Sequence, residues 1–300
     1  MLRASAAVIA LVTGACTTQA PQGPVPVETR FEFPRNQIVV KAQLAGRGEH
    51  ACLIDTGTNP SGLDRKLADQ LGLAITGPGG QAEGVGAESV TVHATQVEVA
   101  LPGTVPSRID TLTGDLSRIS EKIGTPIGCI LGQSWLTTRI VQIDYPKRVV
   151  RFPSEAPAAG AGCETFPMRY WVEDDAMPLV EVKVLGVSYP VTLDTGSSST
   201  LKLFVKDDPP PGFTPTQDSA KTVTGFRGAS TVVPAKVATL SFGPIALRDV
   251  EINMGERNLD EPPGARMGNL GNGVLQHGVL TLDYPSRRVT ICAAPAGEGS

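Results

Sequence analysis

Two aspartates stand in nearly the same local sequence and are the strongest candidates for chemistry in this chain. Asp55 begins the tripeptide Asp-Thr-Gly after Leu53 and Ile54, and Asp194 begins a second Asp-Thr-Gly after Leu193. Two carboxyl groups held about 3 Å apart cannot both ionise readily, so they share one proton. One can then act as a base and the other as an acid on a water between them. We interpret the two stretches as halves of one site.

The spacing of the tripeptides argues against a chance match, although a given tripeptide is expected in roughly one chain in ten or twenty of this length. The aspartates lie 194 − 55 = 139 positions apart. The same distance separates Asp144-Tyr145-Pro146 from Asp283-Tyr284-Pro285, and Leu131-Gly132 from Leu270-Gly271. This register predicts that one unit was duplicated and that each copy carries its own carboxylate.

Short alternating segments must position the two aspartates. Apolar residues alternate over 38–44 and again over 179–185, and each run stops at a glycine, so each half is predicted to open with a β-hairpin. After Asp55 the sequence predicts a turn and then a helix over roughly 63–71, ended by Gly72. The matching stretch of the second half, 207–211, reads Asp-Asp-Pro-Pro-Pro and is predicted to be a loop.

Together these residues resemble the retropepsin-type aspartic peptidases found in bacteria. The likeness rests on Asp-Thr-Gly after an apolar strand, on Ile130-Leu131-Gly132 and on the run from Leu136 to Phe152. Two such units, over roughly 31–152 and 166–292, resemble the two-lobed plan of pepsin. The resemblance implies an all-β, bilobal fold of two β-barrel lobes with few short helices. It also implies an aspartic endopeptidase acting on a peptide or protein substrate, with no cofactor and no metal.

The sequence departs from this family pattern in two places. Asn269 stands where the second apolar residue before Leu270-Gly271 is expected, and neither copy has a clear flap tyrosine.

The resemblance implies supporting roles for the residues around the aspartates. Gly57 and Gly196 permit a tight turn and leave the carboxyl groups approachable. Thr56 and Thr195 are expected to cross-bond beneath the site and tie the lobes together. Thr58 and Ser197 are expected to offer hydroxyls to the carboxylates, which lowers the pKa of an ionised carboxyl. We therefore expect an acidic to mildly acidic pH optimum.

Two glycine-rich segments occupy positions where the family has hairpins over its cleft. They are Gly84-Val85-Gly86 and Gly225-Phe226-Arg227, followed by alternating runs over 90–99 and 231–240. We interpret both as substrate-binding flaps; the alternative is an ordinary surface hairpin in each half.

The cysteines allow two disulfides. Cys52 and Cys129 each lie three positions before a motif residue, on strands that the family packs side by side, while Cys163 and Cys292 bracket the second lobe. We favour these two pairs, with buried free thiols as the open alternative.

The N-terminal residues indicate export. Residues 1–16 have the form of a signal peptide, and Thr13-Gly14-Ala15-Cys16 resembles a bacterial lipobox, which would make Cys16 the lipidated first residue. Ordinary cleavage nearby is the alternative. Residues 17–30 are predicted to be a tether, 153–165 a linker and 293–300 a tail. We expect a monomer in the periplasm or an outer-membrane lipoprotein, which touches the membrane only through that anchor.

Composition and missing motifs exclude several other functions. The formal charge is −4 and the isoelectric point is near 5.5, so nucleic acid is not an expected partner. The sequence has no Gly-x-Ser-x-Gly, no phosphate-binding glycine loop and no His-Glu-x-x-His. Two alternatives stay open: a non-catalytic peptide-binding envelope module on the same fold, and pairing of each unit with another chain.

Overall fold

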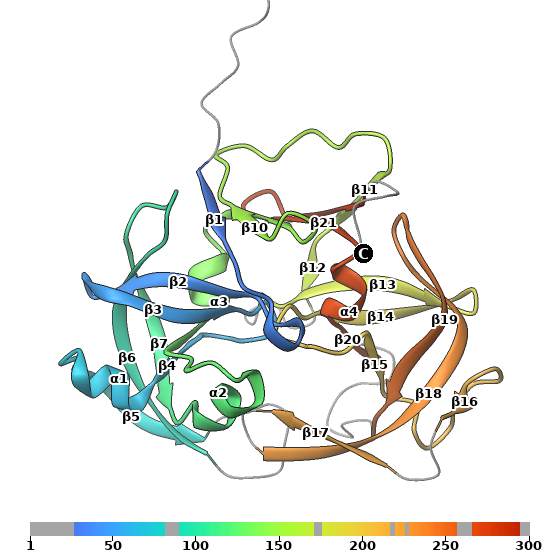
Figure 1. Ribbon diagram of the computed structural model, residues 1–300, viewed down its shortest axis with the longest axis horizontal. Coiled ribbons are helices and arrows are strands. Elements are labelled where there is room, and N and C mark those ends of the chain that lie inside the picture. The colour runs from blue at the N-terminus through green and yellow to red at the C-terminus, as the bar shows by residue number, and fades with distance from the viewer. Residues whose placement is uncertain are drawn as a thin grey trace, which may run out of the picture.

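The computed structural model describes residues 27–81, 90–170, 176–216, 220–225, 228–256 and 266–294. Strands dominate it, and helices are short. Figure 1 shows two β-rich lobes side by side, one blue to green and the other yellow to red. The predicted all-β, bilobal acid-protease fold is confirmed. Among the described helices, none combines the length and apolar character that a membrane crossing requires.

The N-terminal lobe is built on a seven-stranded sheet. Its strand order is β2-β3-β8-β4-β7-β6-β5, and β3 runs parallel to β8. The strands are β2 (Val39–Leu44), β3 (Arg47–Ile54), β4 (Ser61–Asp64), β5 (Ile75–Gln81), β6 (Thr91–Ala100), β7 (Ser107–Gly114) and β8 (Cys129–Leu131).

The C-terminal lobe is built on a nine-stranded sheet. Its main path is β12-β13-β14-β20-β15-β19-β18-β16, with β17 paired to β18, and β14 runs parallel to β20. The strands are β12 (Arg169–Tyr170), β13 (Pro178–Val184), β14 (Val187–Leu193), β15 (Leu201–Leu203), β16 (Thr214–Pro215), β17 (Lys221–Gly225), β18 (Gly228–Phe242), β19 (Ile245–Met254) and β20 (Gly268–Leu270).

A six-stranded sheet joins the two lobes. Its order is β1-β10-β9-β21-β22-β11, so three strands from each half meet at the β9–β21 pair. Figure 1 places this sheet above the two lobes. Its strands are β1 (Glu28–Arg30), β9 (Ile140–Asp144), β10 (Val149–Arg151), β11 (Cys163–Pro167), β21 (Gly278–Asp283) and β22 (Arg288–Ala293).

Corresponding elements of the two lobes recur at the spacing of the motifs. The starts of β2 and β13 are 178 − 39 = 139 positions apart, and those of β8 and β20 are 268 − 129 = 139 apart. Two short helices, α3 (Gln133–Leu136) and α4 (Asn272–Leu275), repeat at 272 − 133 = 139.

The helices show where the sequence pattern was incomplete. Helix α1 covers Arg65–Gln70, so the predicted start at residue 63 is wrong by two residues. Leu63 belongs to β4, and the helix begins only after Asp64, whose side chain accepts a hydrogen bond from the Leu67 N–H as an N-cap. The matching stretch of the second lobe is a loop, as predicted. Helix α2 (Ser117–Ile123) was not predicted.

Buried aliphatic side chains and two disulfides hold the strands together. One continuous apolar cluster extends through both lobes, and a smaller one lies between α2 and strands β2, β3 and β8. The two disulfides join Cys52 to Cys129 and Cys163 to Cys292, so the favoured pairing is confirmed. The first links β3 to β8, three residues before Asp55 in the chain.

Candidate active site

Each aspartate follows the end of a central strand. The Asp55 N–H, just after β3, donates to the carbonyl of Leu131 at 3.0 Å. The Asp194 N–H, just after β14, donates to the carbonyl of Leu270 at 2.9 Å. Because β8 and β20 lie parallel to these strands and hold the aspartate backbones in the same way, the two motifs enter the junction between the lobes with matching geometry.

The threonines of the two motifs bind each other's loops. The Thr56 N–H donates to Thr195 Oγ1 and the Thr195 N–H donates to Thr56 Oγ1, both at 3.0 Å. The hydroxyls donate in turn to the carbonyls of Leu193 and Ile54, at 2.6 and 2.9 Å. All four hydrogen bonds are buried, so the relative position of the two loops is fixed by backbone as well as side-chain atoms.

The two glycines leave space for the opposing carboxyl groups. A Cβ atom on Gly57 would lie 2.7 Å from Oδ1 of Asp194, and one on Gly196 would lie closer still to the carboxyl of Asp55. Each side chain therefore lies over the other motif's glycine, and the carboxyl groups of Asp55 and Asp194 face each other closely enough for the charge of one to raise the pKa of the other. The structure brings together the two aspartates that the spacing singled out.

The partners of the two carboxyl groups differ. The Thr58 hydroxyl donates to Asp55 Oδ2 at 2.7 Å, and the Gly57 N–H donates to Asp55 Oδ1 at 2.8 Å. The corresponding expectation for Ser197 is wrong: its Oγ shares a hydrogen bond with Ser199 Oγ at 2.8 Å. The Ser199 hydroxyl, two residues along the same loop, takes the place of a carboxylate as the partner of the Ser197 hydroxyl.

Asn269 supplies the polar side-chain contact to Asp194. Its Nδ2 donates to Asp194 Oδ2 at 3.2 Å. Its role was missed at the sequence level, although the signal was present in the one polar residue that interrupts the apolar-apolar-Gly pattern. The matching residue of the first half is Ile130, which is buried and apolar.

Burial and mutual repulsion set the protonation of the pair. Burial raises the pKa of Asp55, whereas the hydrogen bonds from Thr58 and Gly57 act in the opposite direction. Burial, followed by the negative charge of Asp55, raises the pKa of Asp194 to about 7. At mildly acidic pH the pair therefore holds a proton, and the pKa of about 7 places that proton on Asp194.

Buried amides support the two loops from behind, and sequence reasoning missed them. Gln133 Nε2 donates to the carbonyl of Thr56 at 2.6 Å, and Asn272 Nδ2 donates to that of Thr195 at 2.7 Å. Gln37 Nε2 donates to the carbonyl of Gly196 at 2.9 Å. Gln133 and Asn272 each directly follow one of the matching Leu-Gly pairs, so the 139-residue spacing could have identified these two amides. It gives no indication of Gln37.

The predicted flaps are only partly described. Gly84, Val85 and Gly86 lie outside the described residues, between β5 and β6. Gly225 ends β17, while Phe226 and Arg227 lie outside the described residues. Cys16 also lies outside them.

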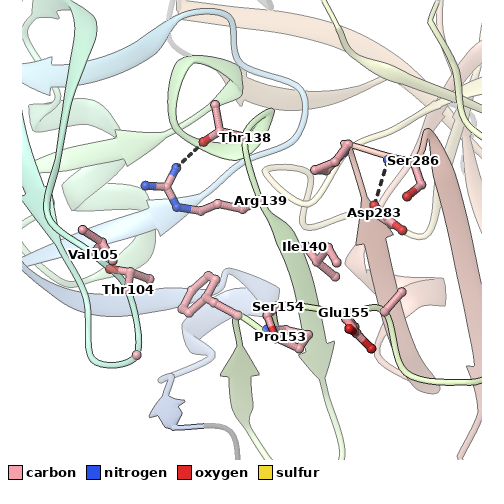
Figure 2. Close-up of a pocket in the computed structure, with 14 residues that line it drawn as sticks. Thr104, Val105, Thr138, Arg139, Ile140, Pro153, Ser154, Glu155, Asp283 and Ser286 are labelled. Carbon is pink, nitrogen blue, oxygen red and sulfur yellow. Dashed lines mark hydrogen bonds between the residues drawn. The ribbon is translucent and has the colours of Figure 1, made fainter.

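A separate cavity of about 640 Å³ lies away from the aspartates. Figure 2 shows the linker residues Pro153, Ser154 and Glu155 along it, with Arg139 toward one end and Asp283 toward the other. The Asp283 carboxylate accepts a hydrogen bond from the Ser286 N–H in its turn, as Asp144 does from the Lys147 N–H. These two aspartates therefore stabilise the turns that follow β9 and β21.

The sheets and the paired loops give the chain the bilobal fold of the acid proteases. A family model described as aspartyl protease matches residues 40–135. That stretch lies in the N-terminal lobe and includes the first Asp-Thr-Gly and Ile130-Leu131-Gly132. No sequence among the curated proteins matches the chain.

Proposed function

We propose that this protein is an aspartic endopeptidase that hydrolyses peptide bonds with a water activated between Asp55 and Asp194. The observation that carries the proposal is the close approach of two partly buried carboxyl groups, each lying over the other motif's glycine, in unequal surroundings. The family match to the N-terminal lobe supports the same class of reaction.

The unequal surroundings assign a role to each carboxyl group. Ionised Asp55, stabilised by Thr58 and Gly57, takes a proton from the water as its oxygen attacks the carbonyl carbon. Protonated Asp194 gives its proton to the carbonyl oxygen, and a tetrahedral intermediate forms without a covalent enzyme adduct. When the C–N bond breaks, the leaving nitrogen takes the proton from Asp55 and the intermediate returns one to Asp194.

The substrate is proposed to be an extended peptide. A bound chain would pair its backbone with strand edges in the cleft and place successive side chains in alternating pockets. One chain supplies both carboxylates and both threonines of the cross-bond, which supports a monomer as the active species.

The decisive experiment compares cleavage of a diverse peptide library by the wild type, Asp55→Asn and Asp194→Asn between about pH 3 and pH 8. Each substitution is expected to lower cleavage by about 10²–10⁴-fold, since each removes one half of the acid–base pair. Asp283→Asn is the matched control, because its side chain still accepts the hydrogen bond from the Ser286 N–H. A wild type that binds peptides and cuts none would favour the peptide-binding module.

We also propose export to the cell envelope with Cys16 lipidated. Two disulfides support an oxidising compartment, because such bonds rarely persist in the cytosol. Mass spectrometry of the N-terminal fragment from wild type and Cys16→Ala would test it. An unmodified fragment that retains residues 1–15 in the wild type would contradict it.

A further inference from the structure

A second group of charged side chains lies near the carboxyl pair, and the proposed reaction does not use it. An open cavity of about 440 Å³ is lined by Arg35, Arg118, Glu121 and Lys122. We call it the cationic pocket. Three cations and one anion give it a formal charge of 3 − 1 = +2, in a chain whose net charge is −4. The local field is therefore opposite in sign to that of the whole molecule.

The loop that carries Arg35 is attached to the second Asp-Thr-Gly loop. This segment, η1 (Pro34–Asn36), is followed by Gln37, whose side chain binds the carbonyl of Gly196. Asn36 Nδ2 donates to the carbonyl of Ser198 at 3.3 Å. Arg35 is thus held beside the loop that presents Asp194.

The backbone of η1 is held in an uncommon conformation. Arg35 and Asn36 both have left-handed backbones, with φ of 51° and 58°, which residues other than glycine rarely adopt. Asn272 Nδ2 fixes this bend by donating to the Asn36 carbonyl at 2.8 Å. The position of Arg35 is therefore set by partly buried contacts that its neighbours Asn36 and Gln37 make with the C-terminal half of the site.

Helix α2 supplies the other lining residues. Its Ile123 belongs to the apolar cluster that contains Leu53 and Ile130, from the strands on which Asp55 is held. Figure 1 shows α2 beside the η1 loop. Lys122 is exposed at the pocket, and partial desolvation of its side chain lowers its pKa. The negative charge of Asp194 opposes that shift, so the ammonium lies within electrostatic range of the carboxyl pair. The cationic pocket therefore borders the site.

The chemistry of the pocket fits a carboxylate. Arg35 makes no hydrogen bond or ion pair with the described residues, and the four lining side chains are exposed to solvent. A guanidinium fork together with an ammonium group is a good match for a carboxylate. We infer that the cationic pocket is a specificity subsite that binds a carboxylate of the peptide substrate, either an Asp or Glu side chain near the scissile bond or a free C-terminus. This inference rests on the proposed function and names the substrate class of that site.

The test uses a set of peptides that differ only in one charged group. A peptide that the wild type cleaves is resynthesised with Glu or Gln at each position in turn, and with a free or amidated C-terminus. We expect one Glu position, or the free C-terminus, to raise kcat/KM about three- to tenfold over its neutral counterpart. The advantage should decrease with added salt.

Substitutions in the cationic pocket then test whether the pocket causes the higher kcat/KM of the Glu peptide. Arg35→Gln combined with Lys122→Gln should bring the Glu-to-Gln ratio close to one, and Arg35→Glu should move the preference toward Lys. Lys183→Gln, an exposed cation on β13, is the matched control and should keep the wild-type ratio. Equal cleavage of Glu and Gln peptides by the wild type, or a ratio unchanged in the double variant, would overturn the inference.

The same peptides also distinguish failure of the peptidase proposal from failure of the carboxylate subsite. If the wild type cuts no peptide, binding of the same peptides is measured instead. A Glu preference that the double variant loses would then support the pocket while the peptidase proposal fails, and equal binding would overturn the pocket.

Discussion

Asn269 donates a hydrogen bond from Nδ2 to Oδ2 of Asp194, at 3.2 Å, where the matching residue on the Asp55 side is the buried Ile130. A donor stabilises the ionised form of a carboxyl group, so Asn269 lowers the pKa of Asp194 against the effects of burial and of the Asp55 charge. The two halves of the site are therefore chemically distinct although their motifs are nearly the same.

Asn269→Ile, which copies the first half, should raise the pKa of Asp194 because the donor is lost. The alkaline limb of the kcat/KM profile, assigned to deprotonation of Asp194, is then expected to move upward by about one pH unit, since hydrogen bonds to charged groups contribute about 1.5–3 kcal/mol. Ile130→Val is the control and should leave that limb in place. An unmoved limb in Asn269→Ile would mean that Asp194 does not set it.

Thr58 and Ser197 should respond differently to the same truncation. Thr58→Ala removes the hydroxyl that stabilises ionised Asp55, so the acidic limb of the profile should move upward and kcat/KM should fall by about tenfold. Thr58→Ser keeps the hydroxyl and should recover most of the activity. Ser197→Ala should have a smaller effect, because Ser197 binds Ser199. Equal losses in the two alanine variants would contradict the asymmetry.

Much of the site could be predicted from the repeated sequence. The shared spacing paired Asp55 with Asp194, and the family likeness placed Thr56 opposite Thr195. These features depend on which backbone positions match between the two halves, and a repeated pattern of residue types shows that match directly. The disulfide between Cys52 and Cys129 follows from the same register, because the two cysteines face each other across parallel strands.

The remaining features, which are individual side-chain hydrogen bonds and the bounds of short helices, could not be predicted from the pattern of residue types. Ser197 was expected to bind a carboxylate, and its hydroxyl shares a hydrogen bond with that of Ser199 instead. Helix α2 was missed because only Ile123 among its residues is fully buried, which leaves a weak apolar period. The start of α1 depends on Asp64, which both ends a strand and caps the helix.

The raised pKa of Asp194 makes stability depend on pH. Its ordinary value of 3.8 becomes about 7 in the folded protein, so folding favours the protonated form. This contribution is fully present below the unfolded pKa and is lost as pH rises through about 7. We expect a lower Tm at pH 8 than at pH 5, with a difference in unfolding free energy on the order of a few kcal/mol.

Asp194→Asn is the comparison for this effect. An amide does not titrate, so the variant should lose most of the decline in Tm between pH 5 and pH 8. Thermal unfolding followed by circular dichroism at both pH values gives the measurement. Parallel declines in the two proteins would assign the pH dependence to other groups.

Tyr145 and Tyr284 occupy matching positions, 139 residues apart, and give a pair of substitutions that differ in one hydrogen bond. The Tyr145 hydroxyl donates to Asn272 Oδ1 at 2.7 Å, in a buried network that also holds Asn36 and Thr195. Within the described residues, the Tyr284 hydroxyl makes no hydrogen bond of normal geometry. Tyr145→Phe leaves a buried amide oxygen unpaired and should cost about 1–3 kcal/mol. Tyr284→Phe should cost less than about 1 kcal/mol, because no partner is orphaned.

Urea unfolding of the two phenylalanine variants, compared at equal m values, measures this difference. Because Asn272 also anchors the η1 loop and the backbone of Thr195, Tyr145→Phe should lower peptide cleavage as well as stability, whereas Tyr284→Phe should leave cleavage closer to the wild type. Equal destabilisation by the two substitutions would show that the hydroxyl of Tyr145 is not what orders Asn272, and that the amide holds the second motif without it.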